Sequence, residues 1–178
     1  PHAHYIYLSH PEFTNDTSLQ INSSKSELKI LILGALTIAK GLKLLEACAI
    51  DAKHSKLPLF FQVLGYPVDE ATTESEIPLS FSGRYQDTEL PTLIARERAD
   101  IIFFPALWPE TYSYTLSYAM NSGLPIAAPK LGAFQERLAE YPAAFLLEWT
   151  STAEDLNALF VSLLSNQPQK SALNNENE

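Results

Sequence analysis

Residues 28–49, with the sequence LKILILGALTIAKGLKLLEACA, decide the fold class of this chain. An apolar run over residues 28–33 is followed by Gly34, and apolar residues at helical spacing begin just after Gly41. A short apolar run, a glycine-containing loop and an amphipathic helix are the successive parts of a βαβ unit. The stretch therefore predicts a parallel sheet whose strands alternate with helices.

The same alternation continues along most of the chain. The predicted strands are residues 28–33, 59–64, 79–82, 101–104, 125–128 and 144–147. Between them, helical faces are predicted at Leu42, Leu45, Ala49 and at Leu90, Leu93, Ile94, and further helices at residues 114–121, 133–140 and 153–164. Six such strands predict an α/β fold, a Rossmann-like doubly wound parallel sheet with helices on both faces.

The composition is that of one acidic domain. The chain has 178 residues, of which 46% are hydrophobic, and a formal net charge of -9 at pH 7. This length suffices for one well-buried domain and is too short for two nucleotide-binding lobes. The charge argues against nucleic acid or an anionic membrane as a partner, because both demand a broad cationic surface. Since no stretch approaches the ~18 apolar residues of a membrane span, we expect a cytoplasmic protein without a transmembrane segment.

The sequence predicts three regions along the chain. Residues 1–27 are rich in Ser, Asn and Thr and predict a linker or N-terminal extension. Residues 28–164 form the expected globular domain, and the polar residues 165–178 predict a disordered tail. Because the chain begins at Pro1 without an initiator methionine, we expect it to be cut from a longer protein.

Cysteine and histidine give no sign of a metal or nucleophilic site. The single cysteine, Cys48, lies in an apolar helical pattern and predicts a packed core thiol. His2, His4 and His10 lack cysteine or carboxylate partners at ligand spacing, so we expect solvated histidines and no metal site.

The loops that follow the strands are the candidate ligand sites, because open α/β sheets bind ligands beyond the carboxyl ends of their strands. In the first such loop, Gly34 permits a turn that a Cβ would obstruct. Lys40 then lies beside a helix N-terminus, where its charge and the free amides favour a phosphate. The spacing differs from a P-loop and from G-x-G-x-x-G. A surface lysine is the open alternative for Lys40.

Two later loops each carry a carboxylate. Glu110 is followed by three residues whose amides, at the start of a helix, are expected to hold a diphosphate: Thr111, Tyr112 and Ser113. Glu110 is then left to accept hydrogen bonds from hydroxyl groups, and complementing the helix dipole is the open alternative. Glu136, which follows Gly132, is expected in the first turn of the next helix, where a capping role explains it without a ligand.

Taken in order, these loops resemble those of the glycosyltransferase group 1 domain of family 4. The most specific stretch, residues 104–136, has the sequence FPALWPETYSYTLSYAMNSGLPIAAPKLGAFQE. Members of that family carry a loop ending in Glu, a helix, the pattern A-M-x-x-G-x-P-V, and a glycine-containing loop ending in Glu. The matching residues here are Ala119, Met120, Gly123, Pro125, Gly132 and Glu136, together with Gly34, Lys40, Gly41 and Gly83.

The resemblance implies the C-terminal, nucleotide-sugar-binding lobe of a two-lobed GT-B enzyme. It implies transfer with retention at the anomeric carbon, with neither a metal nor a cofactor, in surface polysaccharide or glycoconjugate biosynthesis. The implied partners are a nucleotide-diphosphate sugar and the N-terminal acceptor-binding lobe of the same protein, without which the fragment is expected to be inactive. By resemblance, Lys40 faces the donor phosphates, and Glu110, the implied catalytic residue, faces the sugar hydroxyls.

The resemblance also implies which residues surround the base and ribose, namely Gly65, Tyr66, Arg84 and Tyr85, with Tyr85 as a stacking partner. Two positions depart from the family pattern. Tyr118 stands where the family has a second glutamate that binds the ribose hydroxyls, and a phenol cannot clamp a diol as a carboxylate does. Ala35 stands where a basic residue usually follows the first glycine.

Two other functions fit parts of the pattern. Tyr118 and Ala35 favour a degenerate, non-catalytic module that binds a sugar nucleotide or a protein partner. A GT-B-shaped epimerase would need further acid–base residues, and the sequence offers no convincing histidine or carboxylate pair for them.

Overall fold

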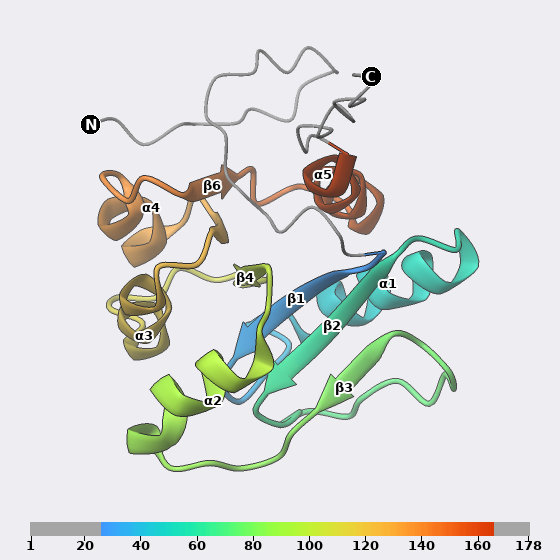
Figure 1. Cartoon of the computed structure of the whole chain (residues 1–178), viewed down its shortest axis with the longest axis horizontal. Helices are drawn as coiled ribbons and strands as arrows, with labels where there is room; N and C mark the ends of the chain where they lie inside the picture. The colour runs from blue at the N-terminus through green and yellow to red at the C-terminus, as the bar shows by residue number, and fades with distance from the viewer. Residues whose placement is uncertain (1–25, 166–178) are drawn as a thin grey trace, which may run out of the picture.

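Six parallel strands form one sheet, in the order β3-β2-β1-β4-β5-β6. The structure is a computed structural model that describes residues 26–165 (Figure 1). The predicted tail and the three N-terminal histidines lie outside the described residues, apart from Ser165, and so does the predicted linker apart from residues 26 and 27. No described helix has the length and apolarity that crossing a bilayer requires.

The observed elements match the predicted alternation. The strands are β1 (Leu28–Leu33), β2 (Leu59–Leu64), β3 (Leu79–Phe81), β4 (Ile101–Phe103), β5 (Ile126–Pro129) and β6 (Ala144–Leu147). The α-helices are α1 (Leu42–His54), α2 (Leu90–Glu97), α3 (Tyr114–Ser122), α4 (Gly132–Leu138) and α5 (Ala153–Ser165). The predicted doubly wound α/β fold is therefore confirmed.

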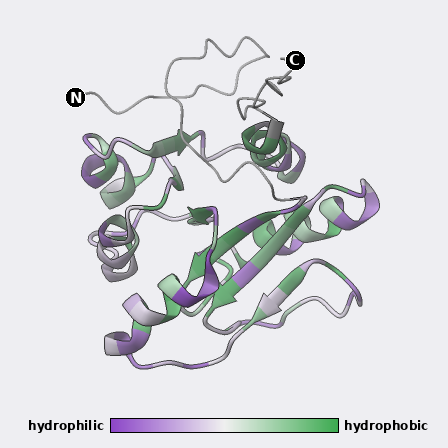
Figure 2. Ribbon diagram, in the orientation of Figure 1, coloured by the Kyte–Doolittle hydropathy of each residue, from purple (hydrophilic) through white to green (hydrophobic). Residues whose placement is uncertain are grey.

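Strands buried on both faces explain why the sequence shows continuous apolar runs rather than alternation. Along β1, Ile30 and Ile32 pack in the layer that contains α1 and α5, whereas Leu31 and Leu33 pack against α2, α3 and α4. Figure 2 shows the resulting hydrophobic strands between helices whose outer faces are more polar. Two apolar cores, one on each face, thus hold the sheet.

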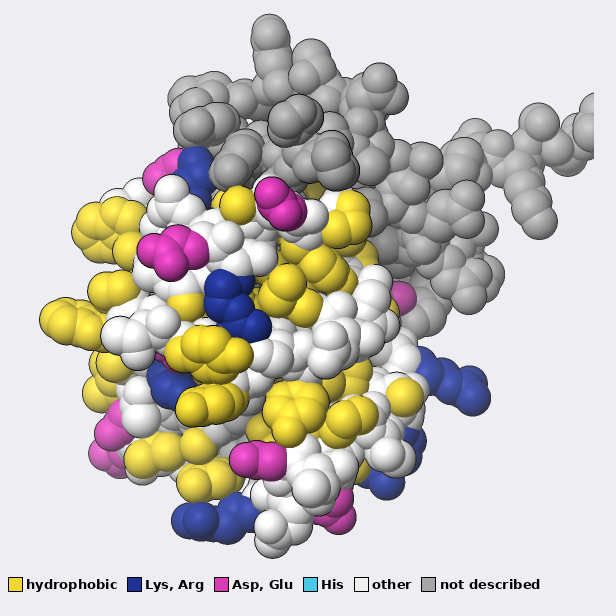
Figure 3. All heavy atoms as spheres, turned by 90° about the vertical axis from the view of Figure 1, so that its left-hand side faces the viewer, with side chains coloured by type: hydrophobic (Ala, Val, Ile, Leu, Met, Phe, Trp, Pro, Cys, Tyr) yellow, Lys and Arg dark blue, Asp and Glu magenta, His cyan; other side chains and the backbone are white. Residues whose placement is uncertain are grey.

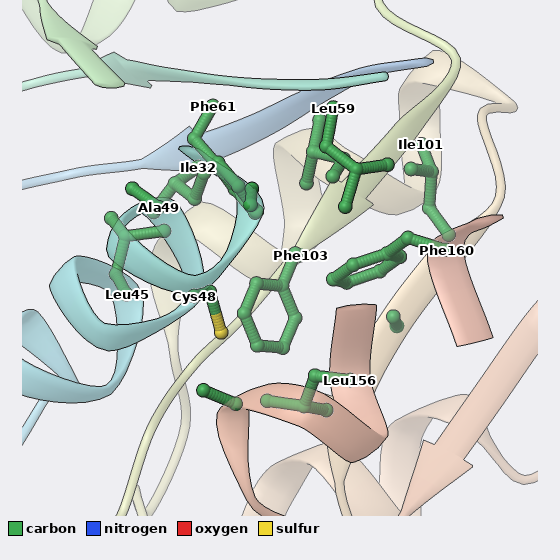
Figure 4. Close-up of a cluster of buried hydrophobic side chains, with 14 of the residues drawn as sticks. Ile32, Leu45, Cys48, Ala49, Leu59, Phe61, Ile101, Phe103, Leu156 and Phe160 are labelled. Carbon is green, nitrogen blue, oxygen red and sulfur yellow. The ribbon is translucent and has the colours of Figure 1, made fainter. Parts of the chain in front are cut away.

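The core beneath α1 and α5 is built around aromatic rings (Figure 4). Phe160 of α5 packs edge-on against Phe61 and Phe103, with ring centroids 6.3 and 5.3 Å away. Cys48 lies in the same core, so the predicted core thiol is confirmed. Burial, followed by the nearby charges of Asp51 and Glu154, raises the pKa of the Cys48 thiol to about 12, which excludes a thiolate nucleophile at neutral pH.

The strand order reverses between β1 and β4. From β1 the chain proceeds outward to β2 and β3, then returns to β4 and proceeds the other way to β5 and β6. The crossover connections therefore diverge beyond the carboxyl ends of β1 and β4, and this is where open α/β sheets bind ligands. The loops after these two strands contain Lys40 and Glu110.

Candidate functional site

The loops after β1 and β4 contact each other directly. The amide of Leu107 donates to the carbonyl of Ala39 at 3.0 Å. Gly41, the residue before α1, has φ 86°, and a Cβ there would lie 1.9 Å from the carbonyl oxygen of Pro105. Only glycine permits both this backbone conformation and this approach. The sequence feature Lys40-Gly41 therefore joins the start of α1 to the β4 loop.

This contact brings together the two charged side chains that the sequence placed in separate loops. The Lys40 Nζ atom lies 3.6 Å from Oε1 of Glu110. The Lys40 side chain is half-exposed and that of Glu110 is 23% exposed. Ion pairs with this exposure contribute only ~0–1 kcal/mol to stability, so an incoming ligand separates them at small cost.

The loop after β2 fastens the Lys40 loop from the other side. Leu36 forms a β-bridge with Pro67, and the amide of Ile38 donates to Oδ2 of Asp69 at 2.6 Å. The buried carboxylate of Glu46, on α1, accepts from the amide of Thr72 at 2.5 Å. Residues 34–41 are therefore held between two neighbouring loops.

The segment after β5 supports Glu110 through a backbone hydrogen bond. The amide of Ala133 donates to the carbonyl of Glu110 at 2.9 Å. Gly132 has φ 48°, and a Cβ on it would lie 2.6 Å from the same carbonyl oxygen. The prediction that Glu136 caps the following helix is wrong, because α4 begins at Gly132 and has no acidic residue in its first turn.

Helix α3 starts at Tyr114, as predicted, but the three residues before it do not supply the helix amides that were expected to hold a diphosphate. The helix begins at Tyr114, so the amides of Thr111 and Tyr112 precede it rather than belonging to its first turn. Ser113 occupies the N-cap position with φ 59°, is buried, and makes no side-chain capping hydrogen bond. The prediction that the amides of these three residues belong to the start of the helix is therefore wrong, because the left-handed backbone of Ser113 keeps the segment before Tyr114 out of the helix.

Arg137 of α4, which no sequence motif marks, organises this segment. Its Nη1 donates to the carbonyls of Tyr112 and Ser113 at 2.7 and 2.9 Å, and its Nη2 donates to Oγ of Ser117 at 2.7 Å. The guanidinium carbon also lies 4.6 Å from the centroid of the Tyr112 ring. No local pattern relates a residue at 137 to the segment 112–117, so only the fold reveals the contact.

The residues expected around the base and ribose form two pairs. The guanidinium carbon of Arg84, after β3, lies 4.4 Å from the centroid of the Tyr66 ring, after β2. Their loops are joined by a hydrogen bond from the Gly83 amide to the Gly65 carbonyl at 2.9 Å. The structure therefore brings together the four loop positions that the resemblance associated with the base side.

The second pair consists of Tyr85 and Tyr118. Both are partly buried and pack against the core beneath α2, α3 and α4. Burial raises the pKa of the Tyr85 hydroxyl, and Asp87 and Tyr118 raise it further. Tyr85 is therefore a neutral phenol at physiological pH, able to donate one hydrogen bond or to present its ring.

The carboxyl edge of the sheet carries the exposed apolar side chains. The exposed large hydrophobic residues of the described chain all lie in the loops after strands or at the first residue of α3: Ile38, Val68, Leu107, Trp108, Tyr112, Tyr114 and Trp149. The arrowheads of β1 and β2 point toward the left-hand side of Figure 1, and Figure 3 shows hydrophobic side chains interspersed with both basic and acidic ones on that side. Within residues 26–165, no group of three His, Cys, Asp or Glu side chains is placed to hold a metal ion.

Solved structures share this fold. HepE from Anabaena, in complex with UDP-glucose, is 19% identical with a TM-score of 0.58; the match covers 77% of this chain and 39% of HepE. Sucrose-phosphate synthase from Thermosynechococcus elongatus is 17% identical with a TM-score of 0.59, over 79% of this chain and 37% of the synthase. This chain therefore spans well under half the length of either protein.

A third solved structure is a single domain of about the same length as this chain. The C-terminal domain of the glycosyl transferase group 1 family protein LpcC from Francisella tularensis is 18% identical with a TM-score of 0.58. That match covers 78% of this chain and 76% of the domain. No curated protein sequence matches the chain.

The family is shown by the sequence itself. The model of the family described as glycosyl transferases group 1 matches residues 14–178, which include every described strand and helix. The match also includes the loops that carry Lys40 and Glu110. This chain belongs to the glycosyl transferases group 1 family.

Proposed function

We propose that this chain is the donor-binding lobe of a retaining, metal-independent GT-B glycosyltransferase of family 4, and that it holds a nucleotide-diphosphate sugar. The observation that carries the proposal is the approach of Lys40 to Glu110 beyond the carboxyl ends of β1 and β4. A cation for a diphosphate and a carboxylate for sugar hydroxyls lie side by side at the place where this fold binds ligands.

In the proposed donor complex, the Lys40 ammonium turns from Glu110 to the diphosphate. The N-terminus of α1 adds partial positive charge beside Lys40, although the amides of Gly41 and Leu42 already donate to the carbonyls of Ile38 and Thr37. Glu110 is then free to accept hydrogen bonds from the sugar, and it is the proposed catalytic residue. Charge developing on the departing diphosphate is stabilised by these groups rather than by a metal or a cofactor. HepE, which has the same fold, is described in complex with UDP-glucose and with UDP and glucose, and this supports a donor of that class.

The proposed base and ribose site lies over the loops after β2 and β3. The stacked Tyr66 and Arg84 offer a flat surface for a base, and Tyr85 and Tyr118 offer rings and neutral hydroxyl groups beside it. Tyr118 makes at most one strong hydrogen bond to a ribose hydroxyl, so we expect the diphosphate and sugar contacts to supply most of the affinity.

The proposed partner is an N-terminal acceptor-binding lobe of the same full-length protein. The exposed apolar side chains at the carboxyl edge support it, because such patches mark surfaces that meet another molecule. The similarity to the C-terminal domain of LpcC supports the same division into lobes. A cytoplasmic place in surface polysaccharide or glycoconjugate biosynthesis is part of the proposal.

A titration of the 178-residue chain with a panel of nucleoside diphosphates and nucleotide sugars tests the proposal. We expect at least one nucleotide sugar to bind, and we expect no glycosyl transfer from the chain alone. Transfer by these 178 residues would contradict the two-lobe proposal.

A second candidate is a non-catalytic module. It is favoured because Tyr118 stands in place of a carboxylate and Ala35 in place of a basic side chain. In that case no member of the panel would bind, or the full-length protein would bind a nucleotide sugar without transferring it. Restoring the N-terminal lobe and measuring turnover separates the two.

A further inference from the structure

Helix α4 donates hydrogen bonds to the backbone of the Glu110 segment from two of its residues. The Ala133 amide holds the Glu110 carbonyl, and the Arg137 guanidinium holds the carbonyls of Tyr112 and Ser113. Ala133 and Arg137 are four residues apart, so they lie on the same face of α4. The segment from Glu110 to Ser113 is therefore laid along one face of this helix.

The partners of Arg137 are neutral. Its guanidinium contacts two carbonyl oxygens, the Ser117 hydroxyl and the face of the Tyr112 ring. A guanidinium has a rigid fork of donors, and here the fork spans the turn before α3 and the first turn of α3 itself. It therefore fixes the direction in which the chain enters the helix, where Ser113 has a left-handed conformation.

We infer that Arg137 is a positioning residue of the donor site. It acts through the backbone of residues 112–117, and so sets where the Glu110 carboxylate and the first amides of α3 face the donor. The inference rests on the proposed function for its ligand. Its structural part, that Arg137 orders this segment in the free chain, does not depend on any ligand.

Two variants separate geometry from charge. Arg137→Lys keeps the positive charge but lacks the planar fork, and Arg137→Met keeps an apolar stem without charge or donors. Arg96→Lys is the matched control, because Arg96 is exposed on α2, away from the loops after β1, β4 and β5. If Arg137 acted only by attracting the diphosphate, Lys would restore binding.

The first measurement uses the free chain. Amide hydrogen exchange of residues 110–117 should accelerate about 10-fold in both Arg137 variants, since each loses charge-assisted hydrogen bonds that hold this segment. Exchange in the central strands should stay unchanged. The chain has two tryptophans, so a Trp149→Phe background leaves Trp108 as the single reporter on this loop, and its emission should shift in the same variants. Unchanged exchange at 110–117 would overturn the inference.

The second measurement is calorimetric titration with UDP and with UDP-glucose. Both Arg137 variants should bind UDP-glucose at least about 10-fold more weakly, while Arg96→Lys binds as the unmodified chain does. Rescue by Lys would show a direct charge effect and overturn the positioning role. If the unmodified chain binds no nucleotide sugar of the panel but exchange at 110–117 still responds, the donor proposal fails and Arg137 remains an organiser of the loop only.

Discussion

The ammonium of Lys40 lies 3.6 Å from the carboxylate of Glu110, across the point at which the strand order reverses. Lys40 comes from the loop after β1 and Glu110 from the loop after β4, and the backbone contacts between Ala39 and Leu107 hold the two loops together. Because this ion pair is weak and both side chains are partly exposed, a ligand with an anionic group and hydroxyl groups can bind to both residues. A nucleotide-diphosphate sugar is such a ligand.

Replacing Lys40 with Ala should weaken nucleoside diphosphate binding about 10-fold or more, because charge-assisted hydrogen bonds to phosphate are worth roughly 1.5–3 kcal/mol. The thermal midpoint should change little, since the side chain is half-exposed. Calorimetric titration measures the first quantity and a melting curve the second. Lys53→Ala, at the opposite end of α1, is the control and should bind normally. An unchanged dissociation constant for Lys40→Ala would leave this residue a surface lysine.

Glu110→Gln should reduce binding of the nucleotide sugar more than binding of the bare nucleoside diphosphate. The amide keeps the shape and one acceptor oxygen but removes the charge that bonds most strongly to hydroxyl groups. Removing the weak pair with Lys40 alters diphosphate affinity by ~1 kcal/mol at most. Titration with both ligands on the same variant is the measurement, and turnover of the full-length enzyme should fall in parallel. Equal losses for both ligands would mean that Glu110 organises the loop instead of contacting the sugar.

Gly132→Ala should disturb the Glu110 loop as well as the stability of the domain. A new Cβ would lie 2.6 Å from the Glu110 carbonyl oxygen, in addition to the cost of a left-handed residue, about 1–2 kcal/mol. Gly123→Ala is the matched control, because Gly123 has φ 72° but no heavy atom within 4 Å of its Cβ position. Both variants should unfold at lower denaturant concentration, and only Gly132→Ala should also weaken nucleotide-sugar binding. Equal binding by the two variants would contradict the proposed support of Glu110 by this glycine.

Cys48 makes stability fall at alkaline pH. Its thiol pKa is raised from 9.0 to about 12 in the fold, so between these values the folded chain retains a proton that the unfolded chain releases. The contribution of the neutral Cys48 thiol to the free energy of unfolding is fully present below pH 9 and is lost as the pH rises toward 12. Between pH 9 and 10 the free energy of unfolding should fall by about 1 kcal/mol more than in Cys48→Ala. Denaturant titrations of both chains at the two pH values measure this difference, and parallel curves would contradict the buried thiol.

Strands β4, β5 and β6 could be predicted from sequence because every residue in them is buried, so that each appears as a continuous apolar run, as residues 144–147 show. The two central loops could be located because the fold class itself says where ligands bind. The start of α3 at Tyr114 agrees with the predicted helix, but the backbone conformation before it could not be predicted, since nothing local in the sequence indicates that Ser113 is left-handed. The contacts of Arg137 and the Lys40–Glu110 ion pair could not be predicted for another reason. Each contact joins residues far apart in the chain, and only the assembled sheet brings them together.

The roles of Lys40 and Glu110 are tested by a crystal structure of this chain with the nucleotide sugar that binds most tightly in the titration panel. We expect a diphosphate oxygen about 3 Å from Lys40 Nζ and a sugar hydroxyl about 3 Å from a Glu110 carboxylate oxygen, with the Lys40–Glu110 pair separated. A nucleotide sugar bound elsewhere, with Lys40 still paired to Glu110 at 3.6 Å, would contradict these roles.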